Sequence, residues 1–431
     1  MNSTPNNERA AAKSHGIPRD VRMHGFSERV TVDEATGWID ARIHAQGKVL
    51  GPEPVAPVDA RGRVLAEAVS SRIDVPSFSR AMMDGFAVRA GDTLGASAYN
   101  RLPLRVIAES LPGRGTSVEV TERTAVRIMT GAPLPSGADA VIPVEVVEIE
   151  EDQVLVLDAV PPGKHVGLPG EDIRIGTTVL PQGRILRPQD VGVLVSIGVA
   201  SIQVVRRPRV RIVVTGNELL APGAVPSGCQ IIDSNSPMLR ALIERDGGVV
   251  LNPGIVADDP DEVLTALRTD ADVIVVSGGS SVGQEDYAPP LVAREGELAI
   301  HGVAMRPSSP VGMGTLGNRL VFLLPGNPVS CLCAYDFFAG RAIRLLGGRQ
   351  RDWPYSRRRL TLARKLVSTV GRVDYARVQI QADRVEPLAI SGASVLSSTT
   401  RADGFVVVPS DSEGYPAGAA VDVFLYDLPV F

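Results

Sequence analysis

Residues 209–220 read RVRIVVTGNELL, and this stretch indicates the fold more directly than any other part of the chain. Its run of branched apolar residues is typical of a β-strand buried on both faces, and the small and polar residues after it indicate a loop. Two later segments repeat the pattern, DVIVVSGG at 272–279 and RLVFLLPG at 319–326. Helix-like segments separate the three strands, so this region is predicted to be a doubly wound α/β domain with a parallel sheet.

The segments on either side have different patterns. Short apolar runs separated by Gly and Pro predict a small all-β unit from about residue 86 to 165, and a β-barrel or sandwich from about 350 to the end. Helices are expected over 32–45, with Thr31 or Asp33 as the N-cap, from about Val58, and over 188–200. The polar residues 1–24 are expected to be a disordered tail.

The composition limits the class of protein. The 431 residues carry 44 Lys or Arg against 49 Asp or Glu, a formal net charge of −5, and 44% of them are hydrophobic. These values exclude a disordered polymer and argue against broad electrostatic binding to nucleic acid or anionic membrane. Neither a signal peptide nor a membrane span is expected, because the N-terminus is polar and the longest apolar stretch, about 191–205, is short and interrupted. The odd number of cysteines, Cys229, Cys331 and Cys333, predicts reduced thiols in a cytoplasmic protein.

Three loops at the predicted strand ends are candidates for a binding site: TGNELL at 215–220, SGGSSVGQEDY at 277–287 and LPGNPVS at 324–330. Gly lets the backbone approach an anion closely, so these loops are interpreted as a cradle for phosphate or another oxyanion. A single Gly-rich turn is usually only a turn, but three at neighbouring strand ends favour a site. The absence of a Walker or GxGxxG pattern leaves little support for a P-loop or a dinucleotide site.

Carboxylates gather at the same strand ends, at Glu218, Asp258, Asp259 and Asp286. Mg²⁺ takes oxygen ligands, often one or two carboxylates together with substrate phosphates, so the loops also suggest a metal–phosphate site. The alternative for each acid is a solvated loop position. Asp258 or Asp259 is equally a candidate N-cap for the helix that starts at PDEV.

Seven motifs occur in a fixed order: MMDGFAV, RIMTGAPLPSGADAVIP, PGEDIRIG, TGNEL, SGGSSVGQEDY, AMRPSSP and LPGNPVS. In this order they resemble the molybdopterin molybdenumtransferase family, which includes MoeA and the E domain of gephyrin. The likeness runs from about residue 26 to the C-terminus. It implies a multidomain α/β plus β fold with four domains: a discontinuous linking domain (25–75 and 166–206), an inserted β domain (76–165), a MogA-like molybdopterin-binding α/β domain (207–348) and a C-terminal β-barrel-like domain (349–431).

The resemblance also implies an activity. Family members insert molybdate into adenylyl-molybdopterin with a divalent metal, here expected to be Mg²⁺, and release AMP to give molybdenum cofactor. They act as homodimers, with an active site between the α/β domain of one subunit and the β insert of the other. A molybdopterin adenylyltransferase as donor and molybdoenzymes as recipients are the further expected partners, with no nucleic acid and no membrane.

The functional residues implied by the resemblance fall into three groups. The catalytic group, of which the first three are expected to reach across the dimer, is Asp84, Thr130, Asp172, Glu218 and Asp286. The metal ligands are Glu218, Asp258 and Asp286. The substrate-binding residues are Thr215, Gly216, Ser277, Gly278, Gly279, Ser281, Gly283, Arg306, Ser309, Pro325, Gly326, Asn327 and Pro328.

The chain departs from the family pattern around the expected molybdate site. The common Lys-Pro-Gly-Lys-Pro run is replaced by residues 306–310, RPSSP, with Arg306 for the first Lys and neutral Ser309 for the second. The basic residue four positions earlier is Gly302, and TGDEL is TGNEL with Asn217. The lost cations suggest an alternative, a weakened paralogue that acts as a molybdopterin-binding chaperone or scaffold. The five retained acids favour an active enzyme.

Overall fold

The computed structural model describes residues 29–45, 49–279, 286–389 and 392–426. It divides into two compact units: unit 1 comprises the chain up to Gly51 and from Val205 onward, and unit 2 comprises Pro52–Val204. The tail predicted at 1–24 lies outside the described residues. Every helix within the described ranges is too short or too polar to cross a membrane.

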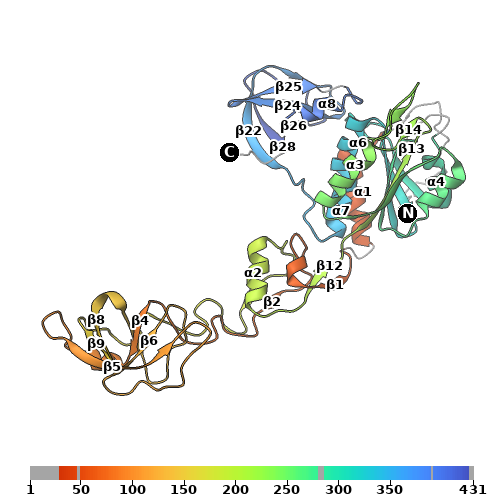
Figure 1. Cartoon of the computed structure of the whole chain (residues 1–431). Helices are drawn as coiled ribbons and strands as arrows, with labels where there is room; N and C mark the ends of the chain where they lie inside the picture. Colours follow the sequence, from red (N-terminus) through yellow and green to blue (C-terminus); the bar gives the residue numbers. More distant parts are fainter. Residues whose placement is uncertain (1–28, 46–48, 280–285, 390–391, 427–431) are drawn as a thin grey trace, which may run out of the picture. The chain divides into compact units, whose positions relative to one another are not determined.

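The centre of unit 1 is a six-stranded sheet (Figure 1). Its first four strands are parallel and its last two antiparallel, which adds an antiparallel edge to the parallel sheet expected from the sequence. The change of direction falls where the chain between 312–316 and 319–324 turns through residues 317–318, too few for the crossover that a parallel pair requires. In sheet order the strands are β16 (Val249–Val256), β13 (Arg209–Thr215), β17 (Val273–Ser277), β21 (Arg319–Leu324), β20 (Gly312–Leu316) and β18 (Glu297–His301).

Helices cover both faces of this sheet, as the doubly wound prediction requires (Figure 1). Alternate residues of β13 explain the two layers, because Ile212 and Val214 belong to one apolar core and Val213 to the other. The core around Ile212 includes α1 (Val32–Ala45), α3 (Asn235–Arg245), α6 (Pro328–Ala334) and α7 (Gly340–Leu346), with a π-helical segment (Tyr335–Ala339) between the last two; the core around Val213 includes α4 (Pro260–Leu267) and α5 (Ala288–Glu295).

Of the two N-cap candidates for α1, Thr31 and Asp33, the structure selects Thr31. The N–H of Glu34 donates to Thr31 Oγ1 at 3.1 Å, and Thr31 N–H donates to Glu34 Oε2 at 2.8 Å, a reciprocal capping box. Ile39 and Ile43 are buried against the core that contains α7. The segment expected to form the linking domain is therefore divided between the two units, because the apolar face of α1 packs in unit 1.

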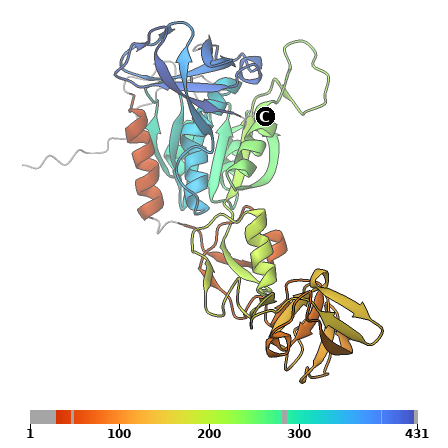
Figure 2. The same cartoon turned by 90° about the vertical axis from the view of Figure 1, so that its left-hand side faces the viewer.

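The C-terminal part of unit 1 is a small closed β barrel, drawn in blue in Figure 2. The ring closes because β24 pairs with both β25 and β26, and the short strand β19 (Met305–Arg306) pairs with β24 from outside the ring. The ring strands are β22 (Ser356–Leu362), β24 (Val373–Gln381), β25 (Arg384–Ala389), β26 (Gly404–Val408) and β28 (Ala420–Leu425).

Unit 2 contains the predicted β domain and the two-stranded pairs that lead into it. The β domain is one six-stranded sheet of β7 (Ala140–Pro143), β4 (Gly85–Val88), β6 (Thr124–Ile128), β5 (Leu102–Ser110), β9 (Gln153–Val156) and β8 (Val147–Glu150). The rest contains α2 (Pro188–Ser196), which confirms a predicted helix, and the pairs β1 (Pro52–Val55) with β12 (Ile202–Val205), β2 (Val69–Ser70) with β11 (Thr178–Leu180), and β3 (Arg80–Ala81) with β10 (Val166–Gly167).

The helix predicted from about Val58 is wrong. A single 3₁₀ turn (Pro57–Asp59) is followed by extended chain, in which Leu65 forms an antiparallel bridge to Val204. The N–H of Leu65 also donates to the carbonyl of Arg184 at 3.0 Å. Backbone pairing with residues more than a hundred positions away outweighs the local helix propensity of this segment.

Candidate functional site

A pocket of about 570 Å³, here called the strand-end pocket, lies at the carboxyl ends of β13, β17 and β21. This is the position at which open α/β sheets bind ligands, and it is where the sequence predicts the site. The predicted residues that line it are Thr215, Gly216, Glu218, Asp258, Ser277, Gly278, Gly279, Asp286, Gly326, Asn327 and Pro328. The predicted residues Ser281 and Gly283 lie outside the described part of the chain.

Glycine lets the strand ends meet in this pocket. Gly278 has a φ of +89°, and a Cβ atom added to it would lie 2.4 Å from the carbonyl oxygen of Thr215. A Cβ on Gly326 would approach the Cα of Gly278 at 3.5 Å. The ends of three neighbouring strands therefore converge with bare backbone facing one another, which leaves room for a ligand close to the main chain.

The two adjacent acids before α4 have different roles. Asp259 is the N-cap, because its carboxylate accepts from the N–H groups of Asp261 at 2.9 Å and Glu262 at 3.1 Å. Asp258 lines the strand-end pocket and accepts from the N–H of Asn217 at 2.9 Å. The structure thus separates the capping and the site alternatives that the sequence left open for this pair.

The predicted metal ligands Glu218, Asp258 and Asp286 all line the strand-end pocket. Within the described residues, however, no three His, Cys, Asp or Glu side chains are close enough to form a ready-made metal cluster. Carboxylate oxygens are suitable donors for Mg²⁺, which usually takes only one or two of them and completes its shell with water and phosphate. The donor set therefore fits an ion bound jointly with a phosphorylated ligand.

Sequence reasoning missed Asp233 and Asn235 in the same pocket. Asp233 accepts from the N–H groups of Asn235 at 2.9 Å and Ser236 at 3.0 Å, and so holds the first turn of α3. The side-chain amide of Asn235 donates to Ser277 Oγ at 2.9 Å and to the carbonyl of Gly326 at 2.7 Å. The run DSNS at 233–236, polar residues at the start of a helix, was the available sequence signal.

A second pocket of about 780 Å³, here called the arginine pocket, is lined by the predicted residues Arg306, Ser309 and Pro325. Asn327 lines both pockets, so the two are neighbours within unit 1. The arginine pocket is also lined by Arg29 and Arg372, which the sequence analysis did not identify.

The charges of the arginine pocket depend on the pairing of β19 with β24, which sets Arg306 opposite Asp374. Asp374 is fully buried and accepts from an Arg306 guanidinium nitrogen at 2.5 Å, while Arg372 Nε lies 3.2 Å from its second oxygen. Three guanidinium groups thus line a pocket beside one carboxylate, and the excess is positive. Arg29 and Arg372 add positive charge to the pocket that neutral Ser309 also lines.

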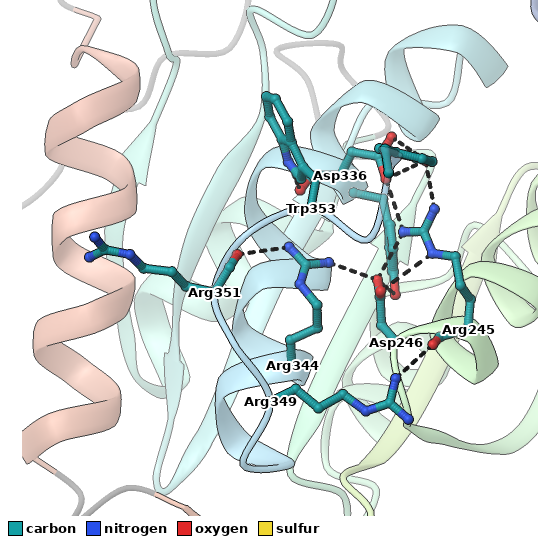
Figure 3. Close-up of polar contacts among 9 residues, drawn as sticks. Arg245, Asp246, Asp336, Arg344, Arg349, Arg351 and Trp353 are labelled. Atoms are coloured by element: carbon teal, nitrogen blue, oxygen red, sulfur yellow. Dashed lines mark hydrogen bonds and ion pairs between the residues drawn. The ribbon is translucent and has the colours of Figure 1, made fainter. Parts of the chain in front are cut away.

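The helices that begin at the strand-end pocket lead into a buried ionic network (Figure 3). At the end of α3, Arg245 donates to Asp246 at 3.0 Å and to Asp336 at 3.1 Å, and Arg344 lies 3.0 Å from Asp246. Burial raises the pKa of Asp336, an effect that the nearby Arg245 opposes. Trp353 donates its indole N–H to the carbonyl of Asp336 at 2.9 Å. The network holds the far ends of the helices that position the pocket and anchors the chain that enters the barrel.

The predicted thiols are core residues rather than site residues. Cys331 and Cys333 on α6 are fully buried, and burial raises the pKa of Cys331 to about 12. All three cysteines are free, and Cys229 is exposed. Cys331 and Cys333 therefore pack as small apolar side chains in the core.

Three predicted site residues lie in unit 2: Asp84, Thr130 and Asp172. The structure brings the first two together. Asp84 Oδ1 accepts from the backbone N–H of Thr130 at 2.6 Å and from its hydroxyl at 2.7 Å. Both bonds lower the pKa of Asp84, and the bond from the Thr130 hydroxyl has the larger effect. Asp172 lies on a separate exposed turn, where its N–H donates to the carbonyl of Val75 at 3.1 Å. Asp84 and Thr130 therefore form a fixed, exposed anionic pair.

Comparison with known proteins places these pockets in context. Three family models match in chain order: "MoeA N-terminal region (domain I and II)" over residues 30–198, "Probable molybdopterin binding domain" over 211–344 and "MoeA C-terminal region (domain IV)" over 359–426. Molybdopterin molybdenumtransferase 2 of Mycobacterium tuberculosis is 35% identical over 386 residues, which cover 86% of this chain and 95% of that protein. Molybdopterin molybdenumtransferase of Staphylococcus aureus is 31% identical over 395 residues, 89% of this chain and 93% of that protein.

Solved structures agree with the sequence comparisons. Two crystal structures of the molybdopterin biosynthesis MoeA protein of Pyrococcus horikoshii match with TM-scores of 0.78 and 0.74. Both are 31% identical in sequence, and each match covers 93% of this chain and 100% of the other.

Proposed function

The chain belongs to the molybdopterin molybdenumtransferase (MoeA) family, and from this premise we propose that it inserts molybdate into adenylyl-molybdopterin and releases AMP, giving molybdenum cofactor. One observation carries the proposal. A pocket with four carboxylates and converging strand ends adjoins a pocket with three arginines, and Asn327 lines both. A phosphorylated nucleotide and a metal oxyanion need two such neighbouring environments.

The two pockets divide the substrates between them. The strand-end pocket takes adenylyl-molybdopterin, whose phosphates lie against the bare backbone after β13, β17 and β21 and near the N-terminus of α3. The arginine pocket takes molybdate, because guanidinium groups can grip an oxyanion with two parallel hydrogen bonds. Asp374 offsets one positive charge and fixes the heads of Arg306 and Arg372.

Mg²⁺ fits the strand-end pocket, where Glu218, Asp258 and Asp286 would hold it together with phosphate oxygens. When bound, it supplies positive charge that stabilises the charge developing on the phosphoryl group. Within the described residues no three carboxylates form a ready-made metal cluster. The coordination shell of the ion would therefore keep positions for substrate oxygens.

Residues of unit 2 complete the proposed site from a second copy of the chain in a homodimer. Asp84 is kept ionised by its two bonds to Thr130, so it presents a fixed acceptor for a substrate or water hydroxyl. Asp172 is the third contribution of that copy. We place the reaction in the cytoplasm, with a molybdopterin adenylyltransferase as supplier and molybdoenzymes as recipients.

The alternative of a scaffold without turnover was motivated by the missing cations at Gly302 and Ser309. Its basis weakens because Arg29 and Arg372 line the same pocket. Three of the five retained carboxylates, Glu218, Asp258 and Asp286, also line one pocket. Both observations favour an active transferase.

AMP release tests the proposal. Purified protein with Mg²⁺, molybdate and adenylyl-molybdopterin is expected to release AMP, and chelation of the metal should stop the reaction. Asp286→Asn is expected to slow release by about 100-fold or more, since it removes a carboxylate beside the reacting phosphate. Glu262→Gln, on the exposed first turn of α4, is the matched control and should retain the rate. Tight binding of adenylyl-molybdopterin without AMP release would instead support the scaffold.

A further inference from the structure

Two buried polar atoms in the strand-end pocket have no hydrogen-bond partner among the described residues: Thr215 Oγ1 and Asn235 Oδ1. Thr215 is 6% exposed and Asn235 is 7% exposed, so bulk water reaches little of either side chain. Buried polar groups in folded proteins are nearly always paired, and an unpaired one is costly. Two such atoms in one pocket leave hydrogen-bonding capacity that a bound molecule could use.

The orientation of the Asn235 amide follows from its neighbours. Its nitrogen donates to the carbonyl of Gly326, an atom that can only accept, and also lies 2.9 Å from Ser277 Oγ. Exchanging the nitrogen and oxygen of the amide would set two acceptors against each other, so the unpaired atom is the carbonyl oxygen. Asn235 therefore ties the ends of β17 and β21 together and presents a pure acceptor.

A pure acceptor selects the kind of group it binds. Ionised phosphate and molybdate oxygens also only accept, so neither pairs with Asn235 Oδ1. An N–H or O–H group does. The Thr215 hydroxyl can in addition pair with a ring nitrogen, and an amino-substituted ring supplies an N–H and a ring nitrogen side by side. This requirement sets the subsite apart from the phosphate-facing backbone in the same pocket.

We infer that Asn235 and Thr215 form a subsite for the amino-substituted fused nitrogen heterocycle of the substrate, with Asn235 accepting from its N–H group. The identity of the heterocycle rests on the proposed function, under which it is the pterin ring or the adenine ring of adenylyl-molybdopterin. The two unpaired atoms do not depend on that proposal. Asn235 is thus a specificity residue outside the set of acids and glycines that the sequence motifs indicate.

Direct binding separates the two rings without needing turnover. Molybdopterin and AMP are titrated separately into wild-type protein and into Thr215→Val, by calorimetry or by pterin fluorescence. The affinity for the ring that occupies the subsite is expected to fall about tenfold, since one ligand hydrogen bond is lost in a buried site. Thr215→Ser keeps the hydroxyl and should keep the affinity. The thermal stability of ligand-free Thr215→Val should stay equal or rise, because the deleted hydroxyl has no partner in the described chain.

Ser236→Ala is the matched control, because Ser236 Oγ is also a buried hydroxyl without a partner in the described residues, and it does not line the pocket. It should leave both affinities unchanged. Asn235→Ala should weaken the same ring as Thr215→Val; if it does not fold, the Thr215 variants still decide.

Each result has a defined meaning. Loss confined to molybdopterin identifies a pterin subsite, loss confined to AMP identifies an adenine subsite, and loss of both identifies a subsite that takes either ring. Unchanged affinities in Thr215→Val and Asn235→Ala would overturn the inference, as would an equal loss in Ser236→Ala. Because AMP release is not used, failure of the proposed transferase activity is a separate outcome.

Discussion

Asp84 lies directly after two exposed methionines. Its carboxylate accepts two hydrogen bonds from Thr130, more than forty residues away in the chain. A hydrogen bond from a hydroxyl and one from a backbone N–H both favour the carboxylate over the carboxylic acid. The pKa of Asp84 is consequently lowered, although the side chain is exposed. A candidate catalytic acid of this kind is ionised throughout the neutral range.

Thr130→Val tests the state of Asp84. Removing the hydroxyl should raise the pKa of Asp84 toward its ordinary value, while the remaining backbone N–H bond leaves it somewhat lowered. A carboxyl group whose pKa is lowered in the folded state stabilises the fold at pH values above its unfolded-state pKa, and this contribution is lost as the pH falls through the folded-state pKa. The folded-state pKa of Asp84 is higher in the variant, so the variant should lose the contribution at a higher pH than wild type. NMR titration of the carboxyl resonance measures the change, and Thr130→Ser is the control. Identical titration curves for wild type and Thr130→Val would show that the hydroxyl does not set the pKa.

At the scale of elements, α3 joins the binding pocket to the interior of unit 1. Its first residue, Asn235, lines the strand-end pocket, and its last, Arg245, lies between Asp246 and Asp336 (Figure 3). Both carboxylates are fully buried, as is the hydroxyl-bearing Tyr335 that donates to Asp246 at 3.0 Å. Loss of one charge from such a network leaves another buried without compensation, which costs far more than loss of an exposed pair. Helix α3 thus connects the pocket wall to charges at its opposite end.

Arg245→Met should destabilise unit 1 by about 3–5 kcal/mol, because buried Asp336 would lose its ion pair with Arg245 while Asp246 keeps its pair with Arg344. Burial already raises the pKa of Asp336. A carboxyl group whose pKa is raised in the folded state lowers the stability of the fold as the pH rises through that folded-state pKa. Removal of Arg245 should raise it further, so the deficit should be larger at pH 8 than at pH 5. Urea denaturation at both values measures it.

Arg240→Met is the control on the same helix. Its pair with Glu244 is 3.0 Å long, with side chains 59% and 54% exposed, so the change should cost less than about 1 kcal/mol. Equal losses in the two variants would show that the network contributes no more than a surface pair.

At the scale of the whole molecule, the proposed catalytic and metal-binding residues are divided between the two units. Asp84, Thr130 and Asp172 belong to unit 2, whereas Glu218, Asp258 and Asp286 belong to unit 1. A homodimer in which unit 2 of one copy serves unit 1 of the other would assemble both sets twice, as twofold symmetry requires. That arrangement makes a prediction about mixtures of defective chains.

Asp84→Asn and Asp286→Asn should each be inactive alone and should complement each other. In a mixed dimer with shared sites, one site carries both substitutions and the other carries neither. Random exchange of subunits should therefore restore about a quarter of the wild-type AMP release. Mixing Asp84→Asn with Thr130→Val, which lie in the same unit, is the control and should restore nothing beyond the activity of the separate proteins. No recovery in the first mixture, after exchange has been verified, would place the whole site within one chain.

Features that depend on near neighbours in the chain were predictable. The apolar runs before TGNELL, SGG and LPGN predict three buried strands and a pocket at their ends, and the choice of Thr31 or Asp33 as N-cap predicts the start of α1. Burial on both faces of a strand requires a continuous apolar run, and a cap needs the right residues three positions apart. The motif order predicted the family, and the comparisons confirm it. The domain boundaries and the roles of the site residues remain predictions.

Features that depend on long-range pairing were decided only by the tertiary structure. The segment after Val58 is extended because Leu65 pairs with distant strands, and Arg372 joins the arginine pocket because β24 pairs with β19. Asn235 becomes a candidate substrate-binding residue only because β17 and β21 end beside it. Local sequence sets which residues form a strand or cap a helix, but the partners of a side chain are set by which distant backbones meet, and no local pattern contains that information.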